Sequence, residues 1–416
     1  MPPSERKLGW VVYKETMMLY RLVFLCGLMC LRVLVAQPPV FSSGSTGADG
    51  ALTFPAGAGL VYFNPANFAA RTNNIYNFTT INIPAGTTVR LSGWIINGPV
   101  FWLAQGDVTI AGTLDLTGQP GHPCCGSILR APSEPGAGGY SGGLGRSLVS
   151  GQLATPGNGP GGGAAPNTTA NTNLYAGGVG SYASSLYLIP LVGGSGGSGG
   201  CSPANGCAGG GGGAGGGAIL IASTTQITIN SGGSITAKGG DNDSGHNYGG
   251  SGSGGAIRLV SNKITNSGGI SVSGGSSPNA LTGVGGTGLA RLEAFTLTPG
   301  SVAGSLITSL PYGLALPIGG SPNLTVASVN GVTINANPFT FPDTSITTSS
   351  AVPVVISGTF IPNNTTGTLY IFSETGSDQA IPFTLTGSFA STTATVNVTY
   401  PAGGSRGFAK ATWVTP

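Results

Sequence analysis

Charged side chains are scarce in this 416-residue sequence, in which Lys, Arg, Asp and Glu together make up 6% of the residues and His occurs twice. Fifteen Lys and Arg residues are too few to neutralise the phosphates of a nucleic acid, which excludes a nucleic-acid-binding protein. The sequence also lacks the high net charge and low hydrophobicity of a disordered chain, because its formal charge is +3 and 40% of its residues are hydrophobic. We therefore expect most of the chain to fold.

Glycine and proline are abundant, with 76 and 29 residues, about a quarter of the chain. The glycines keep no period of three, which excludes a collagen triple helix. A composition so rich in these two residues often indicates low complexity, but the hydrophobic content favours a compact, β-rich protein. The composition therefore informs the architecture more than the chemistry.

A short apolar run, Leu22–Leu31 (LVFLCGLMCL), lies near the N-terminus between two arginines. Ten apolar residues are too few for a membrane-spanning helix, which needs about 20. The run is typical of a secretory signal peptide with cleavage after Ala36, whether the chain starts at its first residue or at Met17 or Met18. We therefore predict that residues 1–36 are a signal peptide, that the protein is secreted or lies on the cell surface, and that no transmembrane anchor remains. A buried core segment is the alternative.

Without residues 1–36 the chain keeps ten basic and ten acidic side chains, so its net charge is zero. A neutral chain is not expected to be steered electrostatically toward a charged partner.

Four cysteines remain after the predicted leader: Cys124, Cys125, Cys201 and Cys207. An even number of cysteines in an exported protein predicts two disulfides, in one of three connectivities. These disulfides would join the two ends of a long glycine-rich stretch. A zinc site that includes His122 is the alternative.

A repeat recurs along the middle of the chain, where Gly215–Ser223 (GGGAILIAS) aligns without gaps with Ser253–Ser261 (SGGAIRLVS), 38 residues later. Each segment is followed by a second and a third short β-rich run, and similar units lie before and after them. Apolar residues alternate with small or polar ones, so one face of each strand is expected to line a core and the other to meet solvent. Repeated units of three short strands predict coils stacked along one axis, with Ile219, Ile257 and Leu289 in one column.

These units, with glycine at their corners, resemble the right-handed parallel β-helix of secreted surface proteins, in particular the Gly-rich haemagglutinin-like and passenger type. The resemblance covers roughly residues 82–310. It implies an all-β fold in which residues 37–310 form a parallel β-helix with three short strands per coil. It passes on no catalytic residue.

The connections between successive coils vary in length, and the longest is an insertion at about 117–217. Part of it, Gly193–Gly217, has 15 glycines in 25 residues. If the coils stack in register, the insertions leave from the same corner, where long loops tend to carry binding surfaces. A wholly disordered insertion is the alternative.

After Pro311 the glycine content falls, and short alternating runs rich in Thr, Val and Ile follow, separated by turn residues such as Asn330–Gly331. This pattern predicts an antiparallel β-sandwich over residues 320–416. It resembles an immunoglobulin-like module without the core disulfide, because no cysteine follows Cys207. Such modules serve as spacers and adhesive units on bacterial surfaces, but the fold alone does not establish function.

Candidate catalytic residues are few. Asp115 is expected to point outward from its strand, but the corresponding positions in the next two units are Thr236 and Ser271, so no row of carboxylates forms. Glycoside hydrolysis requires two carboxylates that face each other across the sugar. We therefore assign no catalytic residue and no metal site, with an active site assembled from acids on different loops as the alternative.

The densest polar stretch runs from Asp241 to His246 (DNDSGH). Asp241 and Asp243 before a glycine are similar to the start of a calcium loop, but the acid that would complete the loop is absent. We expect a polar turn and no cofactor, with Ca²⁺ as the alternative.

Arg258 and Arg291 are predicted at matching outward positions on successive strands, with Glu293 close by. Stacked arginines on an exposed sheet suit a carboxylated sugar, whereas solvated side chains without a ligand are the alternative. The candidate ligand-binding residues are Arg258, Arg291, Asp241, Asp243 and His246.

Three functions are compatible with these observations. The favoured one is a secreted or cell-surface structural or adhesive protein, in which a β-helix displays variable loops and does not act as an enzyme. The second is an extracellular carbohydrate-active enzyme, a polysaccharide lyase or glycoside hydrolase, and the third is a carbohydrate-binding adhesin. The expected partner is a polysaccharide or other cell-surface material. Because terminal coils expose unpaired strand edges unless they are capped, self-assembly is also expected.

Overall fold

The structure is a computed structural model of the chain and describes residues 40–411, apart from 72, 124–130, 148–151, 167–176, 202–208, 243–248, 278–282, 315, 317–322, 335–342 and 374. The chain divides into two compact units, Met1–Phe41 and Ser42–Pro416. Almost all of the first unit, including the predicted signal peptide, lies outside the described residues. The description below concerns the second unit.

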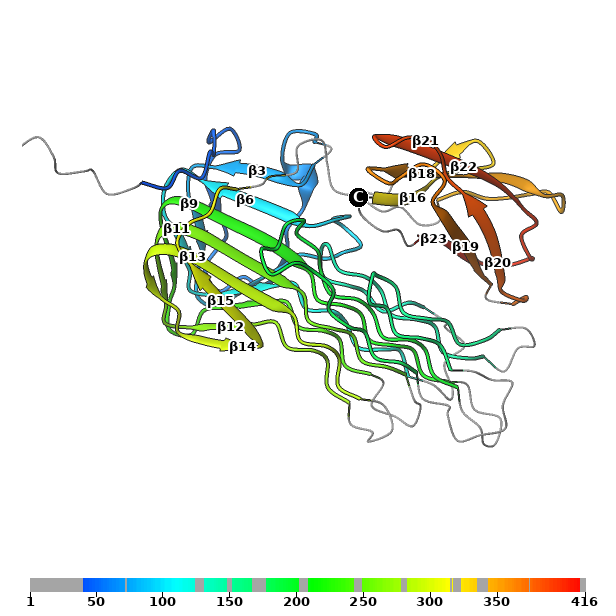
Figure 1. Cartoon of the computed structure of the whole chain (residues 1–416), viewed down its shortest axis with the longest axis horizontal. Helices are drawn as coiled ribbons and strands as arrows, with labels where there is room; N and C mark the ends of the chain where they lie inside the picture. The colour runs from blue at the N-terminus through cyan, green and yellow to red at the C-terminus, as the bar shows by residue number, and fades with distance from the viewer. Residues whose placement is uncertain are drawn as a thin grey trace, which may run out of the picture. The chain divides into compact units, whose positions relative to one another are not determined.

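Two parallel sheets form the first part of this unit (Figure 1). The larger contains nine strands: β1 (Leu52–Thr53), β3 (Ile75–Phe78), β4 (Ile81–Ile83), β6 (Val100–Ala104), β7 (Val108–Ile110), β9 (Ala218–Ile229), β11 (Ala256–Asn266), β13 (Leu289–Thr298) and β15 (Ser305–Ser309). The smaller contains six: β2 (Gly59–Tyr62), β5 (Thr87–Arg90), β8 (Thr113–Asp115), β10 (Ser234–Thr236), β12 (Gly269–Ser271) and β14 (Ser301–Ala303). The chain alternates between the two sheets, so the predicted parallel β-helix is confirmed.

The predicted three strands per coil are distinct in the early coils, for example β6, β7 and β8. In the later coils the first two predicted strands merge into one long strand, as in β9, β11 and β13. The pairing of β9 with β11 shifts register between Ser261 and Lys263, which marks the bend that separates strands in the early coils. In these later coils, strand pairing resumes directly after the register shift. The two apolar runs that the sequence separates by polar residues therefore form one strand.

The predicted offset of 38 residues is confirmed, because Ile257 lies opposite Ile219 in the register of β11 and β9. The next position in this column is Ala290, which pairs with Ile257, whereas Leu289 pairs with Ala256. The expectation that Leu289 continues the column was therefore wrong by one residue. The short side chain of Ala290 takes the inward position, and Leu289 points to the opposite face of its strand.

Aliphatic side chains stack along the interior from coil to coil. In the smaller sheet, the paired inward positions form one column: Val61, Val89, Leu114, Ile235, Ile270 and Val302. The four central members are almost completely buried. No single strand of three or four residues could exclude water in this way, so each coil depends on its neighbours.

Aromatic rings pack together in the interior of the N-terminal coils. Phe63, which precedes the short 3₁₀ helix η1 (Pro65–Asn67), packs against Tyr76 and Trp102 with ring centroids 4.9 and 5.2 Å apart. All three rings are buried. Arg71 lies over the ring of Tyr76 at 4.3 Å and forms an ion pair with Asp49 at 2.6 Å.

Glycine-rich chains leave the parallel strands and run alongside one another on one side of the sheets (Figure 1). Three of them, residues 140–146, 194–200 and 209–216, are hydrogen-bonded pairwise at every third residue. The backbone N–H···O pairs are Tyr140–Gly194, Gly143–Gly197 and Arg146–Gly200; Gly194–Gly216, Gly197–Gly213 and Gly200–Gly210; and Gly215–Tyr140, Gly212–Gly143 and Gly209–Arg146, at 2.7–3.0 Å. A three-residue period is that of an extended polyproline-II-type helix. Further glycine-rich chains, such as residues 249–255, join this set, which we call the glycine bundle.

Glycine is required in the bundle because the chains approach from several sides. A Cβ on Gly212 would lie 2.0 Å from the carbonyl oxygen of Gly197, and one on Gly145 would lie 1.7 Å from that of Gly209. In collagen only glycine fits at the shared axis, once in every three residues. In this bundle each chain has close neighbours on more than one side, so consecutive residues such as Gly212 and Gly213 must both be glycine. The described part of the insertion is therefore an ordered, hydrogen-bonded structure, and the alternative of a wholly disordered insertion is wrong for these residues.

Two antiparallel sheets form the C-terminal part. One contains five strands: β16 (Asn323–Val329), β17 (Val332–Thr333), β18 (Val352–Thr359), β21 (Thr386–Ser388) and β22 (Ser391–Val398). The other contains three: β19 (Thr366–Ser373), β20 (Gln379–Thr384) and β23 (Ser405–Ala411). Inward residues of both sheets, such as Val354 and Leu369, share one core. The predicted antiparallel sandwich is confirmed.

Candidate functional site

The two arginines predicted to bind a ligand lie at matching positions, because Arg258 of β11 pairs with Arg291 of β13. The predicted alignment is therefore confirmed. The expectation that this face is exposed was wrong, since only 1% of Arg258 and 6% of Arg291 is accessible to solvent. Both side chains point away from the interior of the coils and are nevertheless covered by other parts of the chain.

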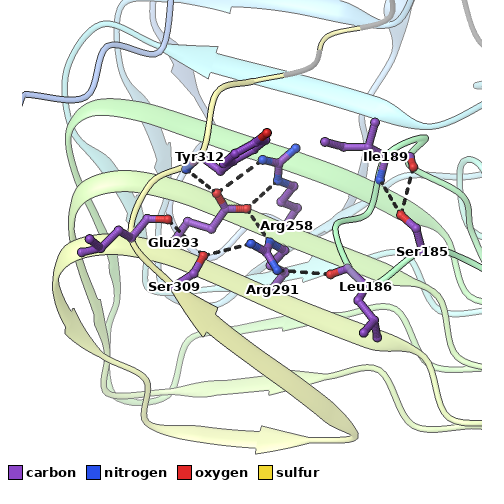
Figure 2. Close-up of polar contacts among 9 residues, drawn as sticks. Ser185, Leu186, Ile189, Arg258, Arg291, Glu293, Ser309 and Tyr312 are labelled. Carbon is purple, nitrogen blue, oxygen red and sulfur yellow. Dashed lines mark hydrogen bonds and ion pairs between the residues drawn. The ribbon is translucent and has the colours of Figure 1, made fainter.

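Glu293 lies between the two guanidinium groups, as Figure 2 shows. Its Oε1 accepts hydrogen bonds from Nε of Arg258 and Nε of Arg291, each at 2.8 Å, and its Oε2 accepts a longer bond of 3.4 Å from Nη2 of Arg258. Glu293 is completely buried. A carboxylate that bridges two arginines in this way is a strong, directional ion-pair arrangement.

Two segments from elsewhere in the chain cover the cluster. Within the insertion, the carbonyl oxygen of Leu186 accepts a hydrogen bond from Arg291 (3.2 Å), and the ring of Tyr187 lies 5.3 Å from its guanidinium carbon. At the end of β15, the hydroxyl of Ser309 accepts a hydrogen bond from Nη2 of Arg291 (2.9 Å), and just after this strand the backbone N–H of Tyr312 donates to Oε2 of Glu293 (2.7 Å). The cluster therefore fastens both segments to the outer face of the parallel sheet (Figure 2).

The cluster carries two positive charges and one negative charge, so its formal net charge is +1. Arg258 Nη1 points away from Glu293, because Nε and Nη2 make both contacts with that carboxylate. This nitrogen is buried, and none of the described residues accepts a hydrogen bond from it. One small acceptor, a water molecule or an anion, would satisfy it. A carboxylated sugar would instead have to displace Glu293, and ligand binding by Arg258 and Arg291 stays a prediction.

A second charged cluster lies on the smaller sheet and contains two acids. Nη1 of Arg90 donates to Asp115 (3.1 Å), and Nη2 of Arg90 donates to Glu134 (3.3 Å). Gln119 donates to the other oxygen of Glu134 (3.1 Å). The two carboxylates share one guanidinium, and Arg90 and Glu134 are buried. The predicted outward positions of Asp115 and Thr236 are confirmed by their pairing.

This cluster is the arrangement in the described residues that comes nearest to a glycosidase acid pair. In such enzymes the two carboxylates face each other across the sugar. Here an arginine occupies the space between the two acids, and burial of Glu134 leaves no room for a sugar beside it. The arrangement supports a structural ion pair.

The polar stretch around residue 241 is only partly described. Oδ1 of Asp241 accepts a hydrogen bond from the backbone N–H of Ser276 (2.7 Å), so this carboxylate joins two chains of the glycine bundle. Asp243 and His246 lie outside the described residues. Within the described part of the chain, no group of three or more His, Cys, Asp or Glu side chains is placed to hold a metal ion.

The structure supports no disulfide among the residues that it describes. Cys201 is buried and has a free thiol, and Nη1 of Arg146 lies 3.6 Å from its sulfur. The other three predicted partners, Cys124, Cys125 and Cys207, lie outside the described residues. Their pairing stays a prediction.

Sequence reasoning identified Arg258, Arg291 and Glu293 but missed what covers them. The alternating pattern of β13 already placed Arg291 and Glu293, two residues apart, on the same face. No comparable signal marked Leu186 or Tyr312, because both come from irregular segments far away in the sequence. Glu134 was missed for the same reason.

No family model, no curated protein and no solved structure matches the chain. In the part of the chain that the structure describes, no helix is long and apolar enough to cross a membrane.

Proposed function

We propose that this protein is a secreted or cell-surface structural or adhesive protein that acts as a rigid scaffold. The parallel coils supply a continuous apolar core, and the glycine bundle extends this framework with hydrogen-bonded chains. In this proposal the rod is of the Gly-rich haemagglutinin or passenger type, and the C-terminal sandwich is an immunoglobulin-like spacer or docking module. The expected ligand is a polysaccharide or other cell-surface material.

The observation that carries the proposal is that several chains of the bundle end side by side. Three backbone N–H groups donate to backbone carbonyl oxygens here: that of Gly211 to His122 (2.9 Å), that of Arg146 to Gly200 (3.0 Å), and that of Gly209 to Arg146 (2.7 Å). The described residues 122, 146, 200 and 209–211 therefore lie at neighbouring points of an ordered framework. Binding residues are often carried by segments that a rigid scaffold positions.

The alternative is an extracellular carbohydrate-active enzyme, and the acids Asp115 and Glu134 are the observation that favours it. They are the described acids that lie closest to the arrangement such an enzyme requires. Their shared contact with Arg90 and the burial of Glu134 favour the scaffold instead.

A panel of soluble and immobilised polysaccharides tests the proposal. The purified protein is incubated with each polysaccharide, and both its retention and the release of reducing ends or unsaturated products are measured. Retention without product supports an adhesive scaffold. Product release that is lost in D115N and E134Q but kept in D107N, a matched change at another acid, would establish the enzyme. No retention on any polysaccharide or cell-surface extract would reject the adhesive role.

A further inference from the structure

The stacked coils end in apolar side chains that are incompletely covered. The column of the smaller sheet begins at Val61 and ends at Val302, and both terminal valines are half-buried, although the members between them are buried. In the larger sheet the column that contains Ile219 and Ile257 ends at Leu306, of which 38% is exposed. Each end would lose this exposed apolar surface if another coil followed it.

The two terminal strands of the smaller sheet are complementary. β2 and β14 are the last strands at either end of its order, so each has one edge without a partner strand in the sheet. All strand pairs in this sheet are parallel. A β2 strand from another chain could therefore pair in parallel with the free edge of β14 and extend the sheet by one strand. With Val302 opposite Val61, the large exposed side chains Leu60 and Tyr62 would lie beside the small residues 301 and 303.

The described chain does not cover the β14 end. After β15 it turns back across the outer face of the larger sheet, where the N–H of Tyr312 donates to Glu293 of β13. At the opposite end, part of the edge of the larger sheet is already covered by residues 49 and 50. The backbone N–H of Asp49 donates to the carbonyl oxygen of Asn77 (2.8 Å), and the backbone N–H of Thr79 donates to the carbonyl oxygen of Gly50 (2.8 Å). Among the described residues, the strands with an unpartnered edge at that end include β1 of the larger sheet and β2 of the smaller sheet, and only β2 has a half-buried valine that continues the column of the smaller sheet.

We propose that the occupant of these edges is a second copy of this chain, bound head to tail. β14 of one copy pairs in parallel with β2 of the next, and Val302 packs against Val61, which continues the aliphatic column across the junction. Each copy uses two different surfaces, so the contact does not close on itself, and added copies form a linear filament. Free edges of this kind template pairing with another chain.

Two variants block one end each: V61K at the β2 end and V302K at the β14 end. A lysine at either half-buried position can extend its amine into solvent in the single chain but would bury a charge in the junction. V284K, a change at an exposed valine of the glycine bundle (65% exposed), is the matched control. The mass of the purified full chain and of each variant is measured by sedimentation velocity over a dilution series, after circular dichroism has confirmed that each is folded.

We expect the wild-type chain and V284K to form species larger than a monomer that dissociate on dilution, and V61K and V302K each to remain monomeric. An equimolar mixture of the two blocked variants should form dimers that contain one copy of each, and nothing longer. A wild-type chain that stays monomeric at every concentration overturns the proposal. So does a dimer of V61K alone, which would show that identical ends associate, or a mixture of the two variants that stays monomeric.

Discussion

The charges of Arg258, Glu293 and Arg291 determine how this buried cluster responds to substitution. Removing the carboxylate in E293Q leaves two buried guanidinium groups without a counter-charge, and we expect a loss of about 3–5 kcal/mol in the free energy of unfolding. Replacing one arginine in R258M leaves a balanced pair of Arg291 and Glu293, and also removes the unsatisfied Nη1. We expect R258M to cost less, about 1–2 kcal/mol.

Chemical denaturation with urea measures both values, with K263M, a change at an exposed residue of the same strand, as a control that should stay within about 0.5 kcal/mol of wild type. Equal losses for E293Q and R258M would contradict the argument from net charge. A carboxylate-rich buffer that restores E293Q would show that the cluster accepts an external anion in place of Glu293.

Tyr76 makes stability depend on pH in the alkaline range. Burial raises the pKa of its hydroxyl from about 10 to about 12, an effect that the positive charge of Arg71 partly opposes. The folded chain therefore keeps the proton at pH values where the unfolded chain loses it. The resulting stabilisation is fully present below pH 10 and is lost as the pH rises toward 12.

We expect Y76F to be at least as stable as wild type at pH 7, because none of the described residues forms a hydrogen bond with the Tyr76 hydroxyl. Between pH 10 and pH 12 its advantage should grow by about 2 kcal/mol. Urea unfolding at several pH values measures this, and Y62F, at a tyrosine that is 47% exposed, is the control. Parallel pH profiles for Y76F and wild type would reject the assignment.

At the scale of structural elements, the glycine bundle depends on close approach between backbones. In G212A the added Cβ would lie 2.0 Å from the carbonyl oxygen of Gly197, so the chains must separate. We expect a loss of about 1–3 kcal/mol. G269A, where a Cβ meets nothing within 4 Å, is the matched control and should be neutral or slightly stabilising. Thermal unfolding followed by circular dichroism compares the two. A loss in G269A as large as that in G212A would contradict close packing as the cause.

The elements divide into those that the sequence predicts and those that it does not. Strands such as β9 and β11 are predictable because their alternation of apolar and small residues is local and repeats in both coils. The bundle is not predictable in this way. A run such as Gly209–Gly213 has no side-chain pattern, and its structure is determined by backbone hydrogen bonds to residues as distant in the sequence as His122 and Arg146.

The candidate site shows the same division. The pairing of Arg258 with Arg291 follows from the repeat, and the position of Glu293 follows from the alternation within one strand. Their burial depends on Leu186 and Tyr312, which contact the cluster. Both residues lie in irregular segments without a repeating sequence pattern, so their position could not be predicted. The sequence therefore located the charged groups but placed them in solvent.

At the scale of the whole molecule, the parallel coils and the C-terminal sandwich have separate hydrophobic cores. Ile257 belongs to the first, Val354 belongs to the second, and the two sets have no residue in common. Cooperative unfolding follows from shared burial, so a chain with two separate cores is expected to unfold in two steps. The sandwich is also of a size at which single domains fold alone.

We therefore expect calorimetry of the full chain to show two transitions. I257A should lower the midpoint of one transition, and V354A the midpoint of the other, because each removes fully buried side-chain volume from one core at a cost of about 2–5 kcal/mol. Residues 320–416 expressed alone should reproduce the transition that V354A shifts. If both substitutions shift the same transition, or if residues 320–416 are unfolded, the sandwich requires the coils for its stability. It would then be part of the rod, and a role as a separate spacer or docking module would no longer hold.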